Sequence, residues 1–369
     1  MNLPIDIQRT PVGKTQPPES QLGFGRVFTD HMFVMQYERG RGWHDARVVP
    51  YGPLSLDPAT TVLHYGQAMF EGMKAFRAPD GAVRMFRPQR HCQRMAAGAP
   101  RLCMPSPDPE FMQRALATLI GVDHDWVPSD PLGALYIRPT LIATDVQLGV
   151  RASSHYTFFI IISPVGPYYP AGFEPLRIWV EDRHVRAAPG GLGSVKASAN
   201  YVASLLASEE ARARGYAQVL WLDATNHRTI EEVSTMNLFV RIGDELITAP
   251  LEGTILGGVT RDSVLTLVRS WGFKASERRL TMDQLIAAQQ DGSLQEVFGC
   301  GTASVIAPVG ELGHAGGRLT VNRGEPGELS RRLYDAIIGI QHGTAPDPFG
   351  WMVEVPKLEA TGQRMRLTA

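Results

Sequence analysis

Apolar residues recur along this chain with two different periods. Runs that alternate with polar residues or are continuously apolar predict strands, while apolar residues at three- and four-residue spacing predict helices. Strands are expected at 31–38, 82–86, 134–145, 155–163, 176–182, 217–223 and 237–250. Helices are expected at 88–104, 109–122, 200–215, 258–272 and 330–343. The first twenty or so residues are proline-rich and polar, which predicts an extended arm.

The order of these elements favours an α+β fold. Strands and helices mix in both halves without the strict alternation of a doubly wound sheet. The length of 369 residues exceeds what one core usually serves, so two domains are predicted. A stretch with four prolines and two glycines at 163–175 breaks any regular element. We therefore expect a small N-terminal domain at 1–165, a linker at 166–180 and a larger C-terminal domain at 181–369.

Composition narrows the class of protein without changing this picture. Hydrophobic residues make up 44% and charged residues 20% of the chain, and the net charge is −1. Without a basic block, the chain lacks the electrostatic pattern of a nucleic-acid binder, and its apolar runs are too short to span a bilayer. Three cysteines give neither a disulfide framework nor a metal-binding spacing. We expect a cytoplasmic enzyme with no nucleic-acid partner, no membrane partner and no metal.

The stretch GGLGSVKASANY at 190–201 places one lysine after a glycine-rich turn. It is not a P-loop, because Val195 and Ala197 flank Lys196 where glycine and a hydroxyl residue are needed. It is not a dinucleotide fingerprint, because Lys196 stands where the last glycine is required. A lysine that is buried among small residues has a lowered pKa and can form a Schiff base with an aldehyde cofactor. A solvent-facing lysine on a flexible loop also fits the local sequence.

Three other segments offer what such a cofactor needs. Glu231 and Glu232 enter an apolar strand, where a buried carboxylate requires a cationic partner such as a pyridinium. LGGVTRD at 256–262 opens a helix whose free backbone N–H groups suit a phosphate. A turn of small residues with a hydroxyl follows at 299–304. The first two segments also have ordinary interpretations, as a solvated strand edge and a capped helix start.

Taken together, the chain resembles the branched-chain amino acid aminotransferases, which are fold-type IV pyridoxal-phosphate enzymes. The resemblance runs from about residue 24 to the last helix, so it covers nearly the whole chain. The segments that carry it are LHYGQAMFEGMKAF (63–76), LYIRPTLIAT (135–144), SPVGPYY (163–169), VRAAPGGLGSVKASANY (185–201), QVLWLD (218–223), IEEVSTMNLF (230–239), LGGVTRD (256–262) and FGCGTAS (298–304). It implies that the C-terminal domain binds the cofactor and contains a mixed, barrel-like sheet.

The resemblance implies pyridoxal 5'-phosphate as the cofactor and assigns roles to matching positions. Lys196 would be the catalytic residue, forming the Schiff base and later moving the proton from Cα. Glu232, and not its neighbour Glu231, would pair with the pyridine nitrogen, and Tyr201 would hydrogen-bond the ring hydroxyl. The phosphate would be held by Arg94, Val259, Thr260 and Thr302.

The resemblance also implies a substrate site and a second subunit. The site would be lined by Phe24, Tyr65, Phe70, Tyr136, Arg138, Tyr168, Thr235, Ala303, Leu148 and Val150. Its aromatic members would favour apolar side chains, and Arg138 would bind substrate carboxylates with Tyr65 and the Ala303 backbone. Leu148 and Val150 match a segment that reaches into the partner subunit's site, so a homodimer is implied.

The implied function is transamination of the branched-chain L-amino acids Leu, Ile and Val with 2-oxoglutarate. A ping-pong mechanism between pyridoxal and pyridoxamine forms would give branched-chain 2-oxo acids and L-glutamate. The alternatives are a D-amino acid aminotransferase or an aminodeoxychorismate lyase of the same fold, and a non-catalytic relative.

Three positions need comment beside the family pattern. His91 stands where the family usually has Asn, and we expect a histidine on a helix surface. Ser304 and Ala307 occupy the positions of a CxxC redox switch, which is therefore absent. Lys74 matches a family lysine without a catalytic role.

Overall fold

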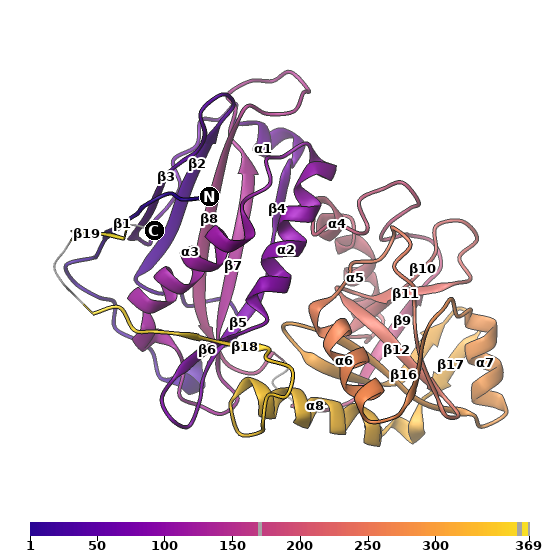
Figure 1. Cartoon of the computed structure of the whole chain (residues 1–369). Coiled ribbons are helices and arrows are strands. Elements are labelled where there is room, and N and C mark those ends of the chain that lie inside the picture. The colour runs from indigo at the N-terminus through magenta and orange to yellow at the C-terminus, as the bar shows by residue number, and fades with distance from the viewer. Residues whose placement is uncertain (169–171, 360–363, 368–369) are drawn as a thin grey trace. The chain divides into compact units, whose positions relative to one another are not determined.

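The computed structural model describes residues 1–168, 172–359 and 364–367, which form two compact units (Figure 1). The first unit comprises Met1–Tyr168, Val195–Ser198 and Gly339–Ala369, and the second comprises Tyr169–Ser194 and Ala199–Ile338. Residues 169–171 of the predicted linker lie outside the described residues. Each unit combines one large sheet with helices, so the α+β prediction is confirmed.

The first unit is built on a ten-stranded sheet. Its strands are β1 Ile5–Gln8, β2 His31–Glu38, β3 Gly42–Pro50, β4 Ala68–Phe70, β5 Met73–Arg77, β6 Val83–Phe86, β7 Ala134–Ala143, β8 His155–Val165, β18 Met352–Val355 and β19 Arg364–Leu367. They follow the order β18-β6-β5-β7-β8-β2-β3-β1-β19, and β4 pairs with β7.

Helices α1 Thr61–Tyr65, α2 Pro88–Gly98 and α3 Pro109–Val122 belong to this unit. Figure 1 shows α2 and α3 side by side over one face of the sheet. The start of α3 is fixed by Asp108, whose carboxylate accepts the Phe111 N–H at 2.8 Å, and by Pro109 at the first helical position. The predicted bounds of β2 and α3 are confirmed.

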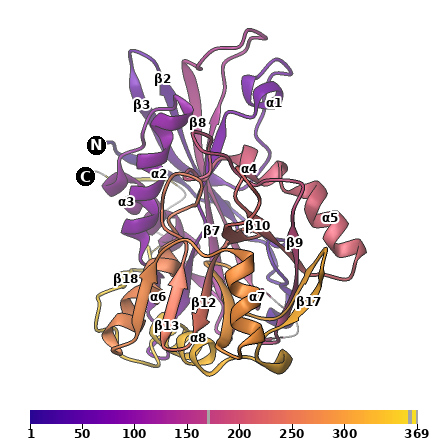
Figure 2. The ribbon, with the colours of Figure 1, turned by 90° about the vertical axis from the view of Figure 1, so that its right-hand side faces the viewer.

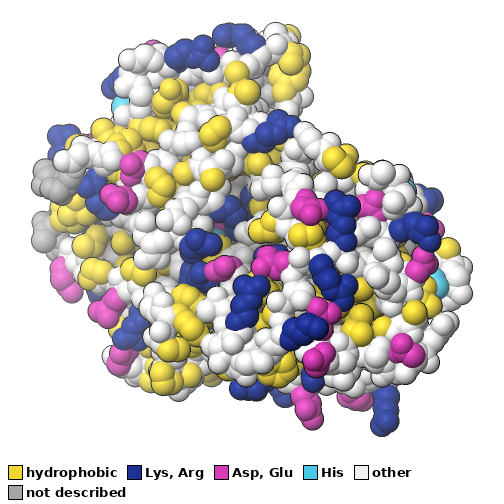
Figure 3. Space-filling model, turned by 45° about the vertical axis from the view of Figure 1, so that its right-hand side comes forward, with side chains coloured by type: hydrophobic (Ala, Val, Ile, Leu, Met, Phe, Trp, Pro, Cys, Tyr) yellow, Lys and Arg dark blue, Asp and Glu magenta, His cyan; other side chains and the backbone are white. Residues whose placement is uncertain are grey.

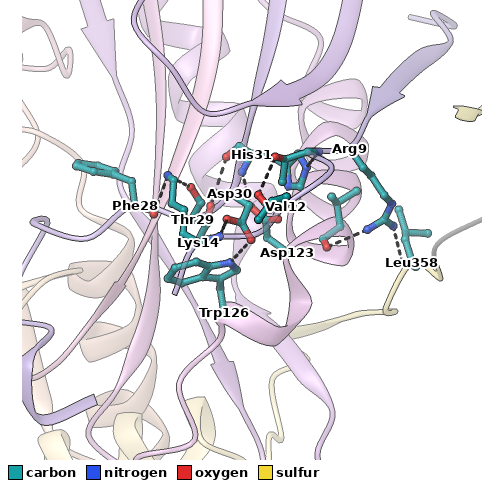
Figure 4. A network of polar contacts seen from close by, with 12 residues as sticks. Arg9, Val12, Lys14, Phe28, Thr29, Asp30, His31, Asp123, Trp126 and Leu358 are labelled. Carbon is teal, nitrogen blue, oxygen red and sulfur yellow. Dashed lines mark hydrogen bonds and ion pairs between the residues drawn. The ribbon is translucent and has the colours of Figure 1, made fainter. Parts of the chain in front are cut away.

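The predicted N-terminal arm contains a strand that the sequence analysis did not foresee. Ile5 and Ile7 of β1 are buried, and β1 pairs with β3 and β19. Beyond it, Arg9 Nη2 donates to the Leu358 carbonyl at 2.7 Å, and the Lys14 N–H donates to Asp30 Oδ1 at 2.7 Å (Figure 4). The proline-rich composition of this segment drew attention away from the alternation of apolar and polar residues at 5–8, which is the signal of the strand.

The second unit contains a nine-stranded sheet that closes on itself. Its strands are β9 Leu176–Glu181, β10 Gln218–Leu222, β11 Ile230–Val233, β12 Met236–Ile242, β13 Glu245–Thr248, β14 Lys274–Glu277, β15 Leu294–Gly301, β16 Val305–His314 and β17 Gly317–Thr320. The path β11-β10-β9-β16-β15-β12 returns to β11, because β11 also pairs with β12. β9 is parallel to β10 and β16, so the predicted mixed, barrel-like sheet is confirmed.

The helices of the second unit are α4 Ser198–Val202, α5 Leu205–Ala213, α6 Val259–Ser270, α7 Met282–Gln290 and α8 Glu328–Gln341. Figure 2 shows α6 and α7 along the outside of the barrel strands. One continuous helix at 200–215 was predicted, but the chain breaks between α4 and α5. Ser204 Oγ donates to the Tyr201 carbonyl at 2.7 Å, a local bond that competes with helix continuation.

Basic and acidic side chains are interspersed on the molecular surface seen in Figure 3, in keeping with the near-zero net charge. Among the described residues, no helix is long and apolar enough to cross a membrane.

Candidate active site

Lys196 lies on a short segment that extends the sheet of the first unit. The Phe70 N–H donates to the Lys196 carbonyl at 3.2 Å, and Met69 and Ala197 form an antiparallel bridge. Val195 and Ala197 are buried on either side, while Lys196 between them is partly exposed. The backbone of Lys196 is therefore fixed by β4, as in a strand, and does not belong to a free loop.

The side chain of Lys196 has the properties of a nucleophile. Its Nζ lies 5.0 Å from the centroid of the Phe70 ring. Burial, followed by the charge of Arg94, lowers the pKa of Lys196 to about 8, against an opposing effect of Glu71. A lysine with this pKa has a substantial neutral fraction near pH 8, and the neutral amine is the form that attacks an aldehyde.

A buried ion pair lies next to Lys196. Glu71 accepts the Nε–H and an Nη2–H of Arg94 at 2.7 and 2.8 Å, and His91 Nδ1 lies 3.0 Å from Glu71 Oε2. Burial alone would raise the pKa of Glu71, but the charge and hydrogen bonds of Arg94, together with His91, hold it well below its usual range. His91 is 1% exposed, so its expected position on the helix surface is wrong.

Five aromatic or cationic side chains of the predicted substrate site meet in the first unit. The Phe24 ring lies 4.9 Å from that of Tyr136 and 5.0 Å from that of Tyr168. Arg138 stacks 4.6 Å from the Phe70 ring centroid, and its Nη2 donates to the Tyr136 hydroxyl at 3.0 Å. The group is apolar except for the Arg138 guanidinium and the tyrosine hydroxyls.

The remaining substrate residues of this unit lie in a more open setting. Tyr65, at the end of α1, is 44% exposed, and its hydroxyl donates to the Leu148 carbonyl. Leu148 and Val150, in the loop between β7 and β8, are 65% and 83% exposed. The structure therefore joins Tyr65 to the loop of Leu148 and exposes the apolar side chains of that loop.

In the second unit, Glu232 is held between an arginine and an amide. Arg186 Nε lies 2.7 Å from Glu232 Oε2, and Asn237 Nδ2 donates to Glu232 Oε1 at 2.9 Å. Both charged side chains are buried, at 7% and 3% exposure. Arg186 is anchored in turn by the Thr254 carbonyl, 2.9 Å from its Nη1. A carboxylate in this setting has a fixed orientation.

The neighbouring Glu231 has different partners, as expected for alternation along β11. Thr254 Oγ1 donates to Glu231 Oε1 at 2.6 Å. Burial raises the pKa of Glu231, against the opposing hydrogen bond from Thr254 and the charge of Arg186.

The predicted anion site lies at the start of α6. Gly258 precedes the helix with extended backbone angles, and Val259 and Thr260 form its first turn. A Cβ on Gly258 would lie 2.0 Å from Asn237 Oδ1, so only glycine fits beside this amide. Asn237 Nδ2 also donates to the Leu256 carbonyl at 2.8 Å. The same asparagine thus contacts the Glu232 carboxylate and the loop that opens α6.

The other predicted positions of this unit lie on turns or helix ends. Tyr201 lies within α4, Thr235 in the turn between β11 and β12, and Thr302 and Ala303 in the turn between β15 and β16. Thr235 is exposed, and the other three are partly exposed.

The glycine run serves packing as well as access. A Cβ on Gly193 would lie 2.2 Å from the Thr254 carbonyl, so the two backbones approach each other only because Gly193 has no side chain. The Gly193 carbonyl also lies 3.4 Å from the Arg186 guanidinium. The glycine run therefore contributes a carbonyl that contacts Arg186, and in the sequence it comes directly before the segment of Lys196.

Comparison with known proteins decides the family. The family model described as amino-transferase class IV matches residues 68–312. The chain is 48% identical over 354 residues to the branched-chain-amino-acid aminotransferase 2 of Bacillus subtilis (strain 168), across 96% of this chain and 98% of the relative. The chain belongs to the class IV aminotransferases.

Further relatives of this class IV aminotransferase are also named as branched-chain amino acid aminotransferases or transaminases. Branched-chain-amino-acid transaminase 1 of the same Bacillus strain is 49% identical over 356 residues, across 96% of this chain and 100% of the relative. The branched-chain amino acid aminotransferase of Escherichia coli superposes with a TM-score of 0.70 at 27% identity, covering 88% of this chain and 99% of that one. A T.th. branched-chain amino acid aminotransferase with pyridoxamine 5'-phosphate gives a TM-score of 0.72 at 25% identity, covering 87% and 98%.

Within this class IV aminotransferase, three residues near the predicted positions escaped the sequence analysis. Arg186, Asn237 and Glu71 each contact a predicted site residue, as described above. All three stand inside segments that carry the family resemblance, but the position of a polar residue in such a segment does not reveal its partner. Lys74 is also buried, and burial lowers its pKa to about 8.

Proposed function

We propose that the chain catalyses transamination of branched-chain L-amino acids with 2-oxoglutarate, using pyridoxal 5'-phosphate. The observation that carries this proposal is the Lys196 amine, with its pKa lowered to about 8, beside the buried Arg94–Glu71 pair. It stands in a chain that is 48% identical, over 96% of its length, to a branched-chain-amino-acid aminotransferase.

The donor set fits the chemistry of this cofactor. An aldehyde needs an amine, a phosphate needs cations and backbone N–H groups, and a pyridine nitrogen needs a carboxylate. The chain offers Lys196, Arg94, the first turn of α6, and Glu232 for these tasks. When bound, the cofactor supplies an electron sink for the carbanion at the substrate Cα.

Each residue then has a defined task. Lys196 Nζ would hold the aldehyde carbon and, once the substrate amine has displaced it, would take up the proton that leaves the substrate Cα. Glu232, fixed by Arg186 and Asn237, would hold a proton on the pyridine nitrogen. Tyr201 would hydrogen-bond the ring hydroxyl. The phosphate would be held by Arg94, Val259, Thr260 and Thr302.

The aromatic group around Arg138 suits two kinds of substrate. The rings of Phe24, Phe70, Tyr136 and Tyr168 offer apolar contact to a branched side chain. Arg138 Nε is buried and makes no hydrogen bond within the described part of the chain. We assign Arg138 to the second carboxylate of glutamate and 2-oxoglutarate, with Tyr65, Thr235 and Ala303 completing the substrate site.

A homodimer is part of the proposal. Large apolar side chains that are 44% to 83% exposed lie at α1 (Leu63 and Tyr65) and in the loop between β7 and β8 (Val146, Leu148 and Val150). Exposed apolar groups of this size mark interaction sites when they lie together, and here α1 and the loop are joined by the Tyr65–Leu148 bond. A second copy of the chain is the occupant we propose.

The visible absorption spectrum of the purified protein tests the function. We expect a yellow protein whose colour bleaches with L-leucine and returns with 2-oxoglutarate. D-leucine should leave the spectrum unchanged, because the other stereochemistry would indicate a D-amino acid aminotransferase. The variant Lys196→Ala should lack the response. A colourless wild-type protein that takes up no pyridoxal 5'-phosphate would refute the proposal.

A further inference from the structure

The buried Glu71 carboxylate is bound to Arg94 in a two-point geometry. Arg94 Nε and Nη2 lie 2.7 and 2.8 Å from Oε1 and Oε2, so the planar guanidinium shares its edge with both carboxylate oxygens. This arrangement fixes direction as well as distance, which a single hydrogen bond does not. Glu71 uses two of the five guanidinium N–H groups and leaves the opposite edge directed away from itself.

Glu71 is itself held rigidly. Its N–H donates to the Pro139 carbonyl at 2.8 Å, which ties it to β7. Oε2 also accepts from the Gly72 N–H at 3.2 Å and lies 3.0 Å from His91 Nδ1. Because a carboxylate can only accept, His91 Nδ1 must carry the hydrogen in this contact. A carboxylate with this many partners cannot swing to follow a mobile arginine.

The same backbone segment positions Lys196. Phe70, the residue before Glu71, donates its N–H to the Lys196 carbonyl at 3.2 Å. The peptide that carries the carboxylate therefore adjoins the peptide that holds the reactive lysine. A change of the Glu71 side chain is therefore transmitted to Arg94 through the carboxylate, while the backbone bond that holds the Lys196 peptide stays in place.

We propose that Glu71 is a positioning residue for the cofactor phosphate, holding the Nε–Nη2 edge of Arg94 so that the opposite edge faces the phosphate, with His91 fixing the carboxylate. This inference rests on the proposed function, because it takes Arg94 as the phosphate ligand. Its energetic basis is preorganisation. A free arginine loses rotamer freedom when it binds an anion, and an arginine already fixed by a carboxylate has lost that freedom on folding.

The test compares two cofactor forms that differ only in the phosphate. Dissociation constants of apoprotein for pyridoxal 5'-phosphate and for pyridoxal are measured by absorbance, for wild type and Glu71→Gln. We expect Glu71→Gln to weaken pyridoxal 5'-phosphate binding by about 10- to 100-fold, the range for a lost charge-assisted hydrogen bond. Pyridoxal binding should change by less than about twofold, a ratio that general destabilisation would not produce.

Arg94→Ala and the double variant provide the second arm. If Glu71 acts through Arg94, Arg94→Ala should abolish the preference for the phosphorylated form, and adding Glu71→Gln should reduce phosphate-dependent binding no further. Additive losses would overturn the proposal. Glu71→Asp, which keeps the charge but shortens the reach, should give an intermediate loss, and it serves the same comparison if Glu71→Gln does not fold.

The matched control is another buried carboxylate–histidine pair of the same unit. His31 Nδ1 lies 2.6 Å from Asp123 Oδ1, and both side chains are buried (Figure 4). Asp123→Asn should lower the melting temperature and leave the ratio of the two dissociation constants unchanged. Equal weakening of both cofactor forms by Glu71→Gln would make Glu71 merely structural. If the wild-type protein itself does not bind pyridoxal 5'-phosphate more tightly than pyridoxal, the result contradicts the proposed function and not only the role of Glu71.

Discussion

Each unit of the molecule buries an arginine–carboxylate pair near residues of the proposed site, and the two pairs differ in how far they are closed to solvent and in what anchors them. In the first unit, Arg94 is the more open partner, with 15% side-chain exposure against 1% for Glu71. In the second, Arg186 and Glu232 are both closed, at 7% and 3%. The anchors also differ. Glu71 is held by backbone and His91, whereas Arg186 is held by the carbonyls of Thr254 and Gly193.

In the proposed function, each pair serves a group of different charge. A phosphate is an anion, so in the first pair Arg94 would bind the phosphate and Glu71 would hold Arg94. A pyridine nitrogen gains a proton, so in the second pair Glu232 would bind that nitrogen and Arg186 would hold Glu232. Burying such a pair costs desolvation free energy, and removing one partner costs more because the other remains as a lone buried charge. Substitutions in the two pairs should therefore have different effects: those at Glu232 and Arg186 on the rate of the reaction, and those at Glu71 and Arg94 on phosphate-dependent cofactor binding.

The largest effect should come from Glu232→Gln. An amide cannot balance a protonated pyridine nitrogen, and the change leaves the Arg186 charge buried without its carboxylate. We expect the rate of the L-leucine half-reaction to fall by about 1,000-fold, measured by single-turnover absorbance. The matched control is Glu231→Gln, which keeps a hydrogen-bond acceptor for Thr254 and should change the rate by less than about threefold. Similar losses at both positions would contradict the assignment of Glu232.

A smaller effect is expected from Arg186→Lys. Lysine keeps the positive charge but cannot contact Glu232 and the Thr254 carbonyl with one planar group. The carboxylate should stay ionised but lose its fixed orientation, so kcat should fall by about 10-fold while the KM for L-leucine changes little. A loss as large as that of Glu232→Gln would mean that Arg186 does more than hold the carboxylate.

The pairs mark the limit of what the sequence predicts. The bounds of β2 and α3 follow from apolar periodicity, whereas the barrel-like sheet was predicted only from the family resemblance. Small neighbours and an apolar strand made Lys196 and the Glu231–Glu232 pair candidates, and the family resemblance selected Lys196 and Glu232 among the alternatives. Their partners were not found. Arg186 lies 46 positions before Glu232 in the sequence, and Glu71 lies 23 positions before Arg94. Periodicity carries no information about such distant side-chain contacts.

The helix break and the N-terminal strand show the same limit at the level of the fold. Helical spacing across 200–215 does not register the bond of Ser204 to the Tyr201 carbonyl, which divides α4 from α5. The strand β1 is stabilised by β3 and β19, from distant parts of the chain, and four residues alone give a weak period-two signal. In both cases the structure depends on a specific contact, which a prediction from the average properties of a sequence window does not include.

The third prediction concerns the pH dependence of Lys196. Because the pKa of this lysine is lowered to about 8, the neutral amine increases about tenfold per pH unit below that value and levels off above it. The rate at which apoprotein reacts with pyridoxal should follow the same curve between pH 6 and 9. Glu71 opposes the lowering, so Glu71→Gln should move the midpoint to lower pH. A midpoint near 10.5 would mean that the amine is solvated as in a free peptide.

The smallest effect should come from His91→Asn. Burial lowers the pKa of His91 more than the Glu71 contact raises it, so the ring stays neutral at physiological pH and donates one hydrogen bond. Asparagine can also donate one bond, and the two bonds from Arg94 to Glu71 remain, so pyridoxal 5'-phosphate affinity should fall by no more than about threefold. The neutral ring also predicts no step near pH 6.5 in cofactor affinity of the wild type. A step near pH 6.5 in the wild type that disappears in His91→Asn would contradict this. It would mean that His91 is protonated in the folded protein, so that Glu71 is held by two cations, Arg94 and His91, and not by Arg94 alone.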